Sequence, residues 1–207
     1  MTMQIIIGLK RLDVAKRRLA AHLAPDQRRQ LMLTMLRAVA SSAHQADLGP
    51  IALATSEPTG AALADELQLA VLSDGDLPWN QGLVHALGQV VPPPRTVMYL
   101  AGDLPLLTAA ELAEFAAAAP PVGVCIARAR DGGTNALVVT PSDAFHPLFG
   151  HPRSSEVHRD SARQLGLPCR VIDLRGLALD VDTIEDARDA DVIPAQLIGR
   201  GPAPARG

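Results

Sequence analysis

Short apolar runs recur along the chain and are separated by longer segments with helical periodicity. Between most of the runs, apolar residues are spaced three or four positions apart, as on one face of a helix. Three such faces consist of Leu31, Met35, Leu36 and Val39, then Leu83, Leu87 and Val90, and then Leu112 and Phe115. The runs themselves have the length and composition of strands and cover residues 3–9, 51–55, 70–73, 96–101, 122–127, 135–140 and 169–174. This alternation predicts a largely parallel sheet with helices on both faces.

Local signals refine this pattern at two helix starts and one turn. Thr108 precedes Ala110 and Glu111 as an N-cap residue, and Thr183 has Asp186 three positions on, close to a capping box. The strands in 122–140 are joined by Arg-Ala-Arg-Asp-Gly-Gly, which leaves no room for a crossover helix. We therefore expect a hairpin there, within an α/β fold of three layers whose sheet is mixed, mostly parallel and Rossmann-like.

The same alternation runs through almost all of the 207 residues, which are enough for one complete core. The sequence predicts a single domain over 1–198, followed by a tail at 199–207 that has nothing to bury and is expected to be disordered. The apolar patch after the first four residues is too short for a secretory signal or a membrane span. We expect a cytoplasmic protein with no membrane attachment.

Charge and composition narrow the classes of partner. The 19 basic residues against 22 acidic ones leave no cationic surplus for a nucleic-acid backbone. Three Phe, one Tyr and one Trp are too few for base-stacking platforms. Cys125 and Cys169 each lie in a strand-like run without a C-x-x-C partner, which predicts buried, reduced thiols rather than a disulfide or a zinc site. A nucleic-acid partner is therefore excluded.

Cations are nevertheless concentrated directly after the first predicted strand, where open α/β sheets bind ligands. Segment 10–18 contains five of them, and its Lys10 and Lys16 are the only lysines in the chain. A cationic loop that leads into a helix suits a polyphosphate. The alternative is a solvated basic helix face, and the Gly-rich spacing of a Walker loop or a dinucleotide fingerprint is missing. The pairing of both lysines in one loop favours a phosphate site.

Three carboxylates have a pattern that suits a metal ion. Asp103 follows the run 96–101 within Gly-Asp-Leu-Pro, while Asp180 and Asp182 occupy alternate positions and point to one side if their segment is a strand. Like charges so placed repel one another unless a cation bridges them or water separates them. Capping of the next turn explains each aspartate alone. Together they are the set that a magnesium-dependent phosphoryl or nucleotidyl transfer needs.

Further polar residues could bind an anion or a base. Thr134 and Asn135 follow two glycines and offer a hydroxyl and an amide, although a plain hairpin turn explains the glycines equally well. Asn80 opens a helix and could bind a nucleobase or ribose, or only cap that helix. Ser154 starts another helix, whose N–H groups could hold an anion. The six histidines lack metal-ligand spacing, and His146 is expected to be exposed.

These segments, in this order, resemble the guanylyltransferases that make the phosphodiester precursor of coenzyme F-420. That family belongs to the wider nucleotidyltransferases that include the molybdenum-cofactor guanylyltransferases. The resemblance spans residues 4 to about 190, and its most specific element is Gly-Thr-Asn-Ala-Leu at 133–137, which the molybdenum branch lacks. It rests on 10–19, Asn80, 102–105, 133–137, Phe149 and Gly150 with Ser154 and His158, and 180–186.

The resemblance implies the fold of nucleotide-diphospho-sugar transferases and a transfer of GMP from GTP with release of pyrophosphate. The acceptor is the phosphate of 2-phospho-L-lactate, phosphoenolpyruvate or 3-phospho-D-glycerate. Because the attacking phosphate oxygen is already an anion, it needs no general base, and catalysis reduces to positioning and charge neutralisation. The implied partners are GTP and a small phosphorylated carboxylic acid, and a homodimer is left open.

The resemblance also implies residue roles. Lys10, Lys16 and Arg18 would be the catalytic cations that hold the triphosphate and stabilise the departing pyrophosphate. Lys10, Lys16, Asn80 and Asp103 would bind the nucleotide. Asp103 and Asp182 would bind Mg²⁺, with Asp180 as an alternative ligand. Thr134, Asn135, Gly150 and Ser154 would bind the acceptor.

One segment departs from the family pattern. Where the family usually has Phe-Gly-Pro-Gly-Ser, residues 149–154 read Phe-Gly-His-Pro-Arg-Ser, which is one residue longer and has a bulky cation in place of a glycine. We hypothesise that Arg153 or His151 alters which phospho-acid is used. Two other readings stay open: a nucleotidyltransferase for molybdopterin or a sugar phosphate, and a non-catalytic nucleotide-binding or assembly module.

Overall fold

Seven strands form one mixed sheet in the computed structural model, which describes residues 3–192. The strand order is β3-β2-β1-β4-β6-β5-β7. Every predicted strand is confirmed, with ends that differ by at most two residues. The strands are β1 (Gln4–Gly8), β2 (Ile51–Ala54), β3 (Ala70–Leu72), β4 (Val97–Ala101), β5 (Gly123–Arg128), β6 (Thr134–Thr140) and β7 (Cys169–Ile172).

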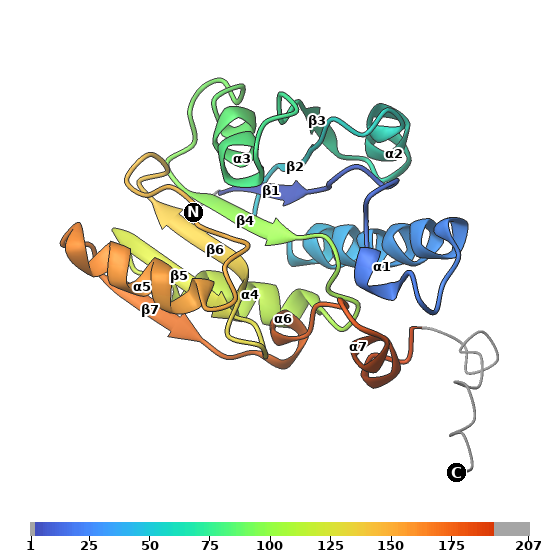
Figure 1. The fold of residues 1–207 in the computed structure, drawn as a ribbon. Helices are drawn as coiled ribbons and strands as arrows, with labels where there is room; N and C mark the ends of the chain where they lie inside the picture. The colour runs from blue at the N-terminus through green and yellow to red at the C-terminus, as the bar shows by residue number, and fades with distance from the viewer. Residues whose placement is uncertain (1–2, 193–207) are drawn as a thin grey trace, which may run out of the picture.

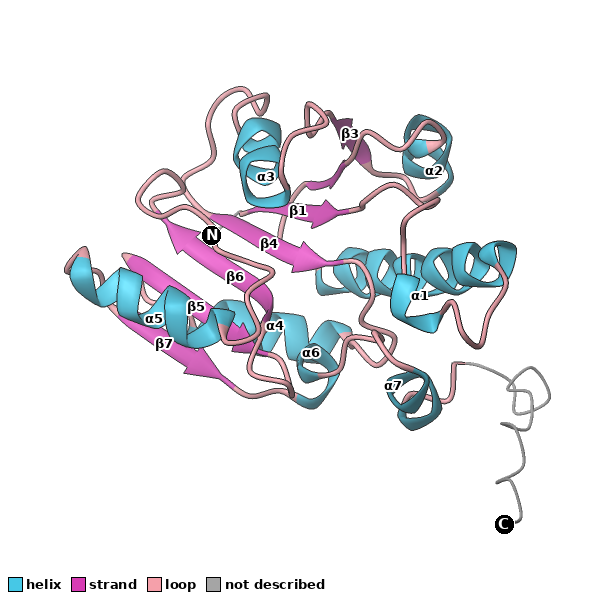
Figure 2. Cartoon of the chain, in the orientation of Figure 1, coloured by secondary structure: helices cyan, strands magenta, loops and turns pink. Residues whose placement is uncertain are grey.

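β6 is the strand that makes the sheet mixed. It runs antiparallel to both of its neighbours, β4 and β5, while every other neighbouring pair is parallel. β5 and β6 form the expected hairpin, with an irregular register between Ala127 and Arg128. Figure 2 shows β6 between β4 and β5. The predicted fold class is therefore correct.

Helices cover both faces of the sheet, as Figure 1 shows. On β1, Ile5 and Ile7 pack into the core below α1, α2 and α4, while Ile6 faces the core below α3 and α5. The strand period of two thus divides the apolar residues between the two layers. The helices are α1 (Pro25–Ala46), α2 (Gly60–Glu66), α3 (Trp79–Leu87), α4 (Ala109–Ala118), α5 (Ser154–Gln164), α6 (Arg175–Ala178) and α7 (Ile184–Asp189).

Both predicted N-caps are confirmed. The Thr108 hydroxyl accepts the backbone N–H of Glu111 at 3.2 Å, and that of Thr183 accepts the N–H of Asp186 at 3.2 Å. Each acidic side chain also reaches back to its cap residue, so two otherwise unpaired N–H groups are satisfied at each helix start.

The structure corrects three details. Val90 lies beyond the end of α3, because the helix stops at Leu87 before Gly88. The segment 179–183, which would be a strand under one reading of its alternating aspartates, is an extended loop without strand pairing. Cys125 is a buried free thiol as predicted, but Cys169 is only half-buried at the start of the edge strand β7.

Two further expectations concern membrane attachment and the C-terminal tail. Among the described helices, none combines the length and apolar character that a bilayer span requires. The predicted tail at 199–207 lies outside the described residues.

Candidate active site

A cavity of about 320 Å³ lies at the carboxyl ends of β1 and β4. The loop after β1 brings Lys10 and Lys16 to it, and Asp103 reaches it two residues after β4. Gly8 at the end of β1 leaves room for the Trp79 ring, which a Cβ at this position would overlap. Trp79 can therefore form a cavity wall directly against the strand, with the Lys10 ammonium 4.9 Å from its ring centre.

Lys16 is the centre of the charged cluster. Its backbone has a φ of 52°, a left-handed conformation that costs a non-glycine residue about 1 kcal/mol. The side chain is 5% exposed, and its Nζ donates to Asp103 and, at 3.0 Å, to Asp182. Burial disfavours the ammonium, but the two carboxylates more than offset this and raise the pKa of Lys16. Lys16 is therefore a fixed cation at the cavity floor.

Asp180 completes the cluster from the loop before α7. Its carboxylate accepts a hydrogen bond from the Asn135 side chain at 3.1 Å, and the same amide donates to the Leu177 carbonyl at 2.9 Å. Burial, together with the negative charge of Asp103, raises the pKa of Asp180 to about 6. Asn135 thus holds an aspartate in place, and its amide hydrogens are both used within the protein.

The three aspartates could hold a metal ion. One carboxylate oxygen from each of Asp103, Asp180 and Asp182 lies within 4.8 Å of the others. Oxygen ligands at this spacing suit a hard divalent cation. The donor set therefore fits the metal expected from the sequence.

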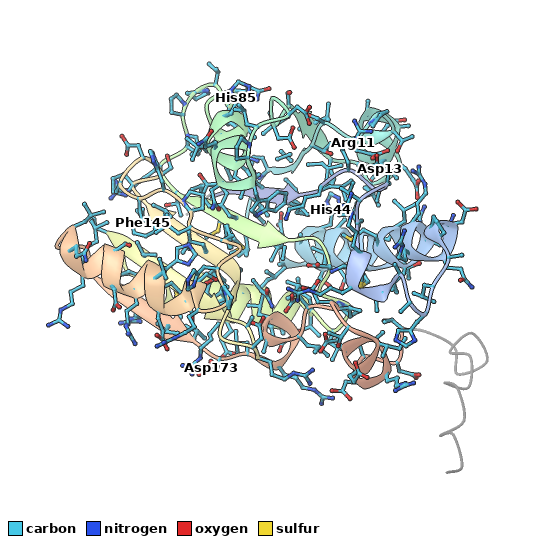
Figure 3. All side chains as sticks on the ribbon, in the orientation of Figure 1. Arg11, Asp13, His44, His85, Phe145 and Asp173 are labelled. Atoms are coloured by element: carbon cyan, nitrogen blue, oxygen red, sulfur yellow. The ribbon has the colours of Figure 1, made fainter. Side chains whose placement is uncertain are left out.

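Polar contacts behind the basic loop fix its path. The buried Glu57 carboxylate accepts the Leu12 backbone N–H at 2.8 Å, and the Thr55 hydroxyl donates to the Leu9 carbonyl at 2.7 Å. Burial opposes ionisation of Glu57, but the hydrogen bonds that its carboxylate accepts from Leu12 and Thr59 outweigh this and lower its pKa. The loop that carries both lysines is thus attached to the end of β2. At its outer side Arg11 pairs with Asp13 at 3.1 Å. Both residues are labelled in Figure 3.

Thr134, Phe149 and Gly150 line a second part of the cavity, the Thr134–Gly150 end. Asn80 holds this part of the chain, because its side-chain oxygen accepts the Phe149 N–H at 2.9 Å and its nitrogen donates to the Phe149 carbonyl at 3.0 Å. Ser154 is buried and donates to the Thr134 hydroxyl at 3.1 Å. This end offers uncharged hydrogen-bonding groups, in contrast to the charged cluster.

The structure brings most of the predicted site residues to this one cavity. Arg18, Asn80 and Ser154 do not line it, and their predicted ligand contacts remain predictions. Arg18 is 73% exposed, donates to Asp182 at 3.2 Å, and lines a neighbouring hollow that shares Asp180 and Asp182. The cavity is lined by Lys10, Lys16, Asp103, Thr134, Asn135, Gly150, Asp180 and Asp182 among the predicted residues.

The unusual segment 149–154 contributes less to the cavity than its sequence suggests. The Arg153 guanidinium is exposed and pairs with Glu156, one turn into α5. Within residues 3–192, neither Arg153 nor His151 lines the cavity. The hypothesis that these residues alter the acceptor is therefore untested, and no direct contact with the cavity supports it.

Sequence reasoning assigned no role to Glu57 or His158. Glu57 acts through a backbone hydrogen bond that no local pattern reveals. His158 is fully buried on α5, and the spacing of Ser154, His158 and Ala162 by four residues is a signal that could have placed all three on the inner face of a helix.

A larger hollow of about 880 Å³ lies beside the β5–β6 turn, and its chemistry is different. Two of its arginines are paired there, Arg128 with Asp173 at 2.5 Å and Arg130 with Asp189 at 2.7 Å. These two arginines are thus engaged within the protein, and this hollow contains none of the lysines and aspartates of the charged cluster.

Comparison with known proteins agrees with this geometry. The chain is 36% identical over 194 residues to a phosphoenolpyruvate guanylyltransferase of Sphaerobacter thermophilus, covering 91% of this chain and 92% of that protein. A Desulfovibrio desulfuricans crystal structure described as a nucleotide-diphospho-sugar transferase has a TM-score of 0.75 at 16% identity and covers 90% of this chain and 85% of its own. A Mycobacterium tuberculosis protein in complex with manganese has a TM-score of 0.57 at 21% identity, covering 92% and 98%.

The two structural similarities show the fold alone, whereas the sequence comparison assigns the family. The model of the family described as "Guanylyl transferase CofC like" matches residues 3–192. The match includes both lysines, all three aspartates and the Thr134–Gly150 end of the cavity. The chain therefore belongs to the CofC-like guanylyl transferases.

Proposed function

We propose that this protein transfers GMP from GTP to the phosphate of a three-carbon phospho-acid, with phosphoenolpyruvate as the first candidate, in a Mg²⁺-dependent reaction. The observation that carries the proposal is the convergence of Lys16, Asp103, Asp180 and Asp182 in one cavity that Thr134 and Gly150 also line. A triphosphate with its metal ion needs the lysine and the carboxylates, and a small anionic acceptor needs hydrogen-bond donors such as Thr134 and the backbone of Gly150.

In this reaction an oxygen of the acceptor phosphate attacks the α-phosphorus of GTP. A new P–O bond forms, the bond from the α-phosphorus to its bridging oxygen breaks, and pyrophosphate leaves with the electron pair. Lys16 and Lys10 lie where they can neutralise the triphosphate, and Lys16 is already fixed before substrate binds. A preorganised cation of this kind stabilises the developing charge without reorganisation.

The three aspartates would hold the metal ion. When bound, Mg²⁺ offsets the triphosphate charge and orients the α-phosphate for in-line attack. Asn135 keeps Asp180 aimed at the cluster, since its amide is also fixed to Leu177. Lys16 donates to two of the same carboxylates, so it balances their charge before a substrate arrives.

The acceptor would occupy the Thr134–Gly150 end. Phosphoenolpyruvate is the first candidate because the curated relatives that match nearly the whole chain carry that name. All three candidate acids share a phosphate and a carboxylate on a three-carbon frame, so they can use the same donors. The surroundings of Phe149 and Gly150 then decide which frame fits.

The test is a matrix of reactions followed by pyrophosphate release. The protein is incubated with Mg²⁺, with GTP, ATP or CTP, and with each of the three phospho-acids, molybdopterin or a sugar 1-phosphate. We expect release with GTP and a three-carbon phospho-acid, and loss of release when EDTA is added. Release only with molybdopterin or a sugar phosphate would contradict the proposal and favour the other nucleotidyltransferases.

A further inference from the structure

A chain of buried polar side chains lies directly behind the acceptor end of the cavity. Thr134 on β6 contacts two residues of α5: its hydroxyl oxygen is 3.0 Å from Nδ1 of His158 and 3.1 Å from the hydroxyl of Ser154. His158 is 0% exposed, and Ser154 and Thr134 are also buried. Of the three, only Thr134 is among the residues that line the cavity.

The backbone fixes which nitrogen of His158 carries the proton. The Leu148 N–H donates to Nε2 of His158 at 2.8 Å, and an amide N–H can only donate. Nε2 must therefore be unprotonated, which excludes both the imidazolium and the Nε2–H tautomer. The remaining neutral form carries its proton on Nδ1. The lowered pKa of this buried imidazole, about 4, agrees with a neutral ring.

This assignment determines the direction of the Thr134 hydroxyl. In the contact between His158 and Thr134, Nδ1–H must be the donor and the Thr134 oxygen the acceptor. The Ser154 hydroxyl donates to the same oxygen. Both lone pairs of that oxygen are then in use. The hydroxyl hydrogen of Thr134 is left free, and the side chain lies in the cavity wall. Thr134 therefore meets a ligand as a hydrogen-bond donor.

The same imidazole also holds the segment of Leu148 to Gly150 in place. Its contact with Leu148 holds the backbone directly before Phe149 and Gly150, which line the cavity. The Phe149 ring packs edge-on against the imidazole with centres 5.3 Å apart, and Phe145, beside α5 in Figure 3, lies 5.9 Å away. One side chain thus orients Thr134 and supports a second segment that lines the same cavity.

We propose that His158 is a positioning residue for the acceptor: by donating to Thr134 it forces the Thr134 hydroxyl to donate to an oxyanion of the phospho-acid. The inference rests on the proposed function, because it assigns the Thr134 end to the acceptor. A carboxylate or phosphate oxygen can accept such a bond, whereas a neutral donor group would face a hydroxyl that cannot accept. His158 thereby selects for a hydrogen-bond acceptor at this position, and an oxyanion is the acceptor that the phospho-acid offers.

Two substitutions separate the two contacts of the imidazole. In His158→Asn, the side-chain nitrogen lies close to the former Nδ1 and can still donate to Thr134. In His158→Gln, the side-chain oxygen can reach the place of Nε2 and accept from Leu148, but the donor to Thr134 is lost. The exposed residue His146, changed to Gln, is the matched control.

Steady-state kinetics with GTP and phosphoenolpyruvate then give the test. His158→Gln should raise the KM for the phospho-acid roughly tenfold, the loss expected when a hydrogen bond to a charged group weakens, while kcat and the KM for GTP change little. His158→Asn should retain most of the wild-type KM. Thr134→Val should also raise the acceptor KM roughly tenfold, and His158→Gln should add no further increase in that background.

Three results would overturn the inference. Equal effects of His158→Asn and His158→Gln, equal increases in the KM for GTP and for the acceptor, or full additivity with Thr134→Val would show a structural role only. If a His158 variant does not fold, ¹⁵N spectra of labelled histidine in the wild-type protein decide instead. The imidazole whose signals change least between pH 7 and pH 5 should be the Nδ1–H tautomer, and an Nε2–H tautomer would refute the assignment.

These outcomes are distinct from failure of the proposed function. Absence of GMP transfer to all three phospho-acids would reject that function and leave the tautomer measurement unaffected. Transfer that proceeds with an acceptor KM insensitive to His158→Gln would retain the function and reject the positioning role.

Discussion

The buried imidazole of His158 should make the stability of this protein depend on pH in a defined range. Burial lowers its pKa from 6.5 to about 4 in the folded state, whereas the unfolded chain keeps the ordinary value. Between these two values the unfolded state binds a proton that the folded state does not bind. Stability is therefore lost as the pH is lowered through 6.5 toward 4, and it is fully present above that range.

The size of the effect follows from the shift of about 2.5 pKa units, which at about 1.4 kcal/mol per unit is about 3 kcal/mol. Solvent screening does not reduce this figure, because the side chain is 0% exposed. The loss is a large fraction of the stability of a typical domain. It should thus be measurable even in the presence of other titrating groups.

Urea denaturation at a series of pH values from 7.5 to 4, in buffer with EDTA, measures this contribution. His158→Gln removes the titrating group and keeps an acceptor for the Leu148 N–H. The free energy of unfolding of the wild-type protein should decline by about 3 kcal/mol more than that of the variant over this range. Carboxylates titrate in both proteins and cancel in the difference. Parallel curves for the two proteins would refute the reasoning, and exposed His146→Gln should follow the wild type.

Substitutions at four further positions test the site. Lys16→Met removes the cation between Asp103 and Asp182, so urea denaturation in EDTA should show a free energy of unfolding lower by about 2 kcal/mol. Added Mg²⁺ should restore part of this loss. A loss that Mg²⁺ does not reduce would speak against a shared metal site. Asp103→Asn should reduce kcat for pyrophosphate release by roughly a hundredfold or more, whereas full activity would favour a non-catalytic module. Glu57→Ala leaves the Leu12 N–H without its acceptor, so it should cost about 1 to 2 kcal/mol in denaturation and raise the KM for GTP, and Glu57→Gln should cost less. Arg153→Gly should leave the ranking of the three phospho-acids unchanged, because its guanidinium pairs with Glu156 outside the cavity; an altered ranking in the same pyrophosphate assay would support the hypothesis drawn from the sequence.

Features of the fold that depend on neighbouring residues in sequence were predictable. The strand runs, the caps at Thr108 and Thr183, and the hairpin all have local causes, namely side-chain periodicity, a short polar residue and a connection too short for a helix. Val90 was misplaced because apolar spacing continues past Gly88, where the helix already ends. Apolar periodicity indicates which residues are buried, but it defines the end of a helix less well.

The charged half of the site was predictable for a different reason. Strands of a parallel sheet deliver their carboxyl ends to one edge, so Lys16 after β1 and Asp103 after β4 had to be close once the topology was known. The contacts of Glu57 and His158 had no such signal. Each depends on a side chain that meets the backbone of a distant segment, Leu12 in one case and Leu148 in the other. Contacts of this kind can be identified only from a three-dimensional structure.

The antiparallel direction of β6 has a consequence for the geometry of the site. Because β4 and β6 are paired in opposite directions, the end of one and the beginning of the other meet at the same edge, with Leu100 opposite Ala136. The separation between Asp103 and Thr134 is therefore set by a ladder of backbone hydrogen bonds. A shift by one residue would displace Thr134 by about 3.3 Å and turn its side chain to the other face. Under the proposed function, the register of β4 and β6 thus fixes where the acceptor-binding hydroxyl lies relative to the metal-binding carboxylate.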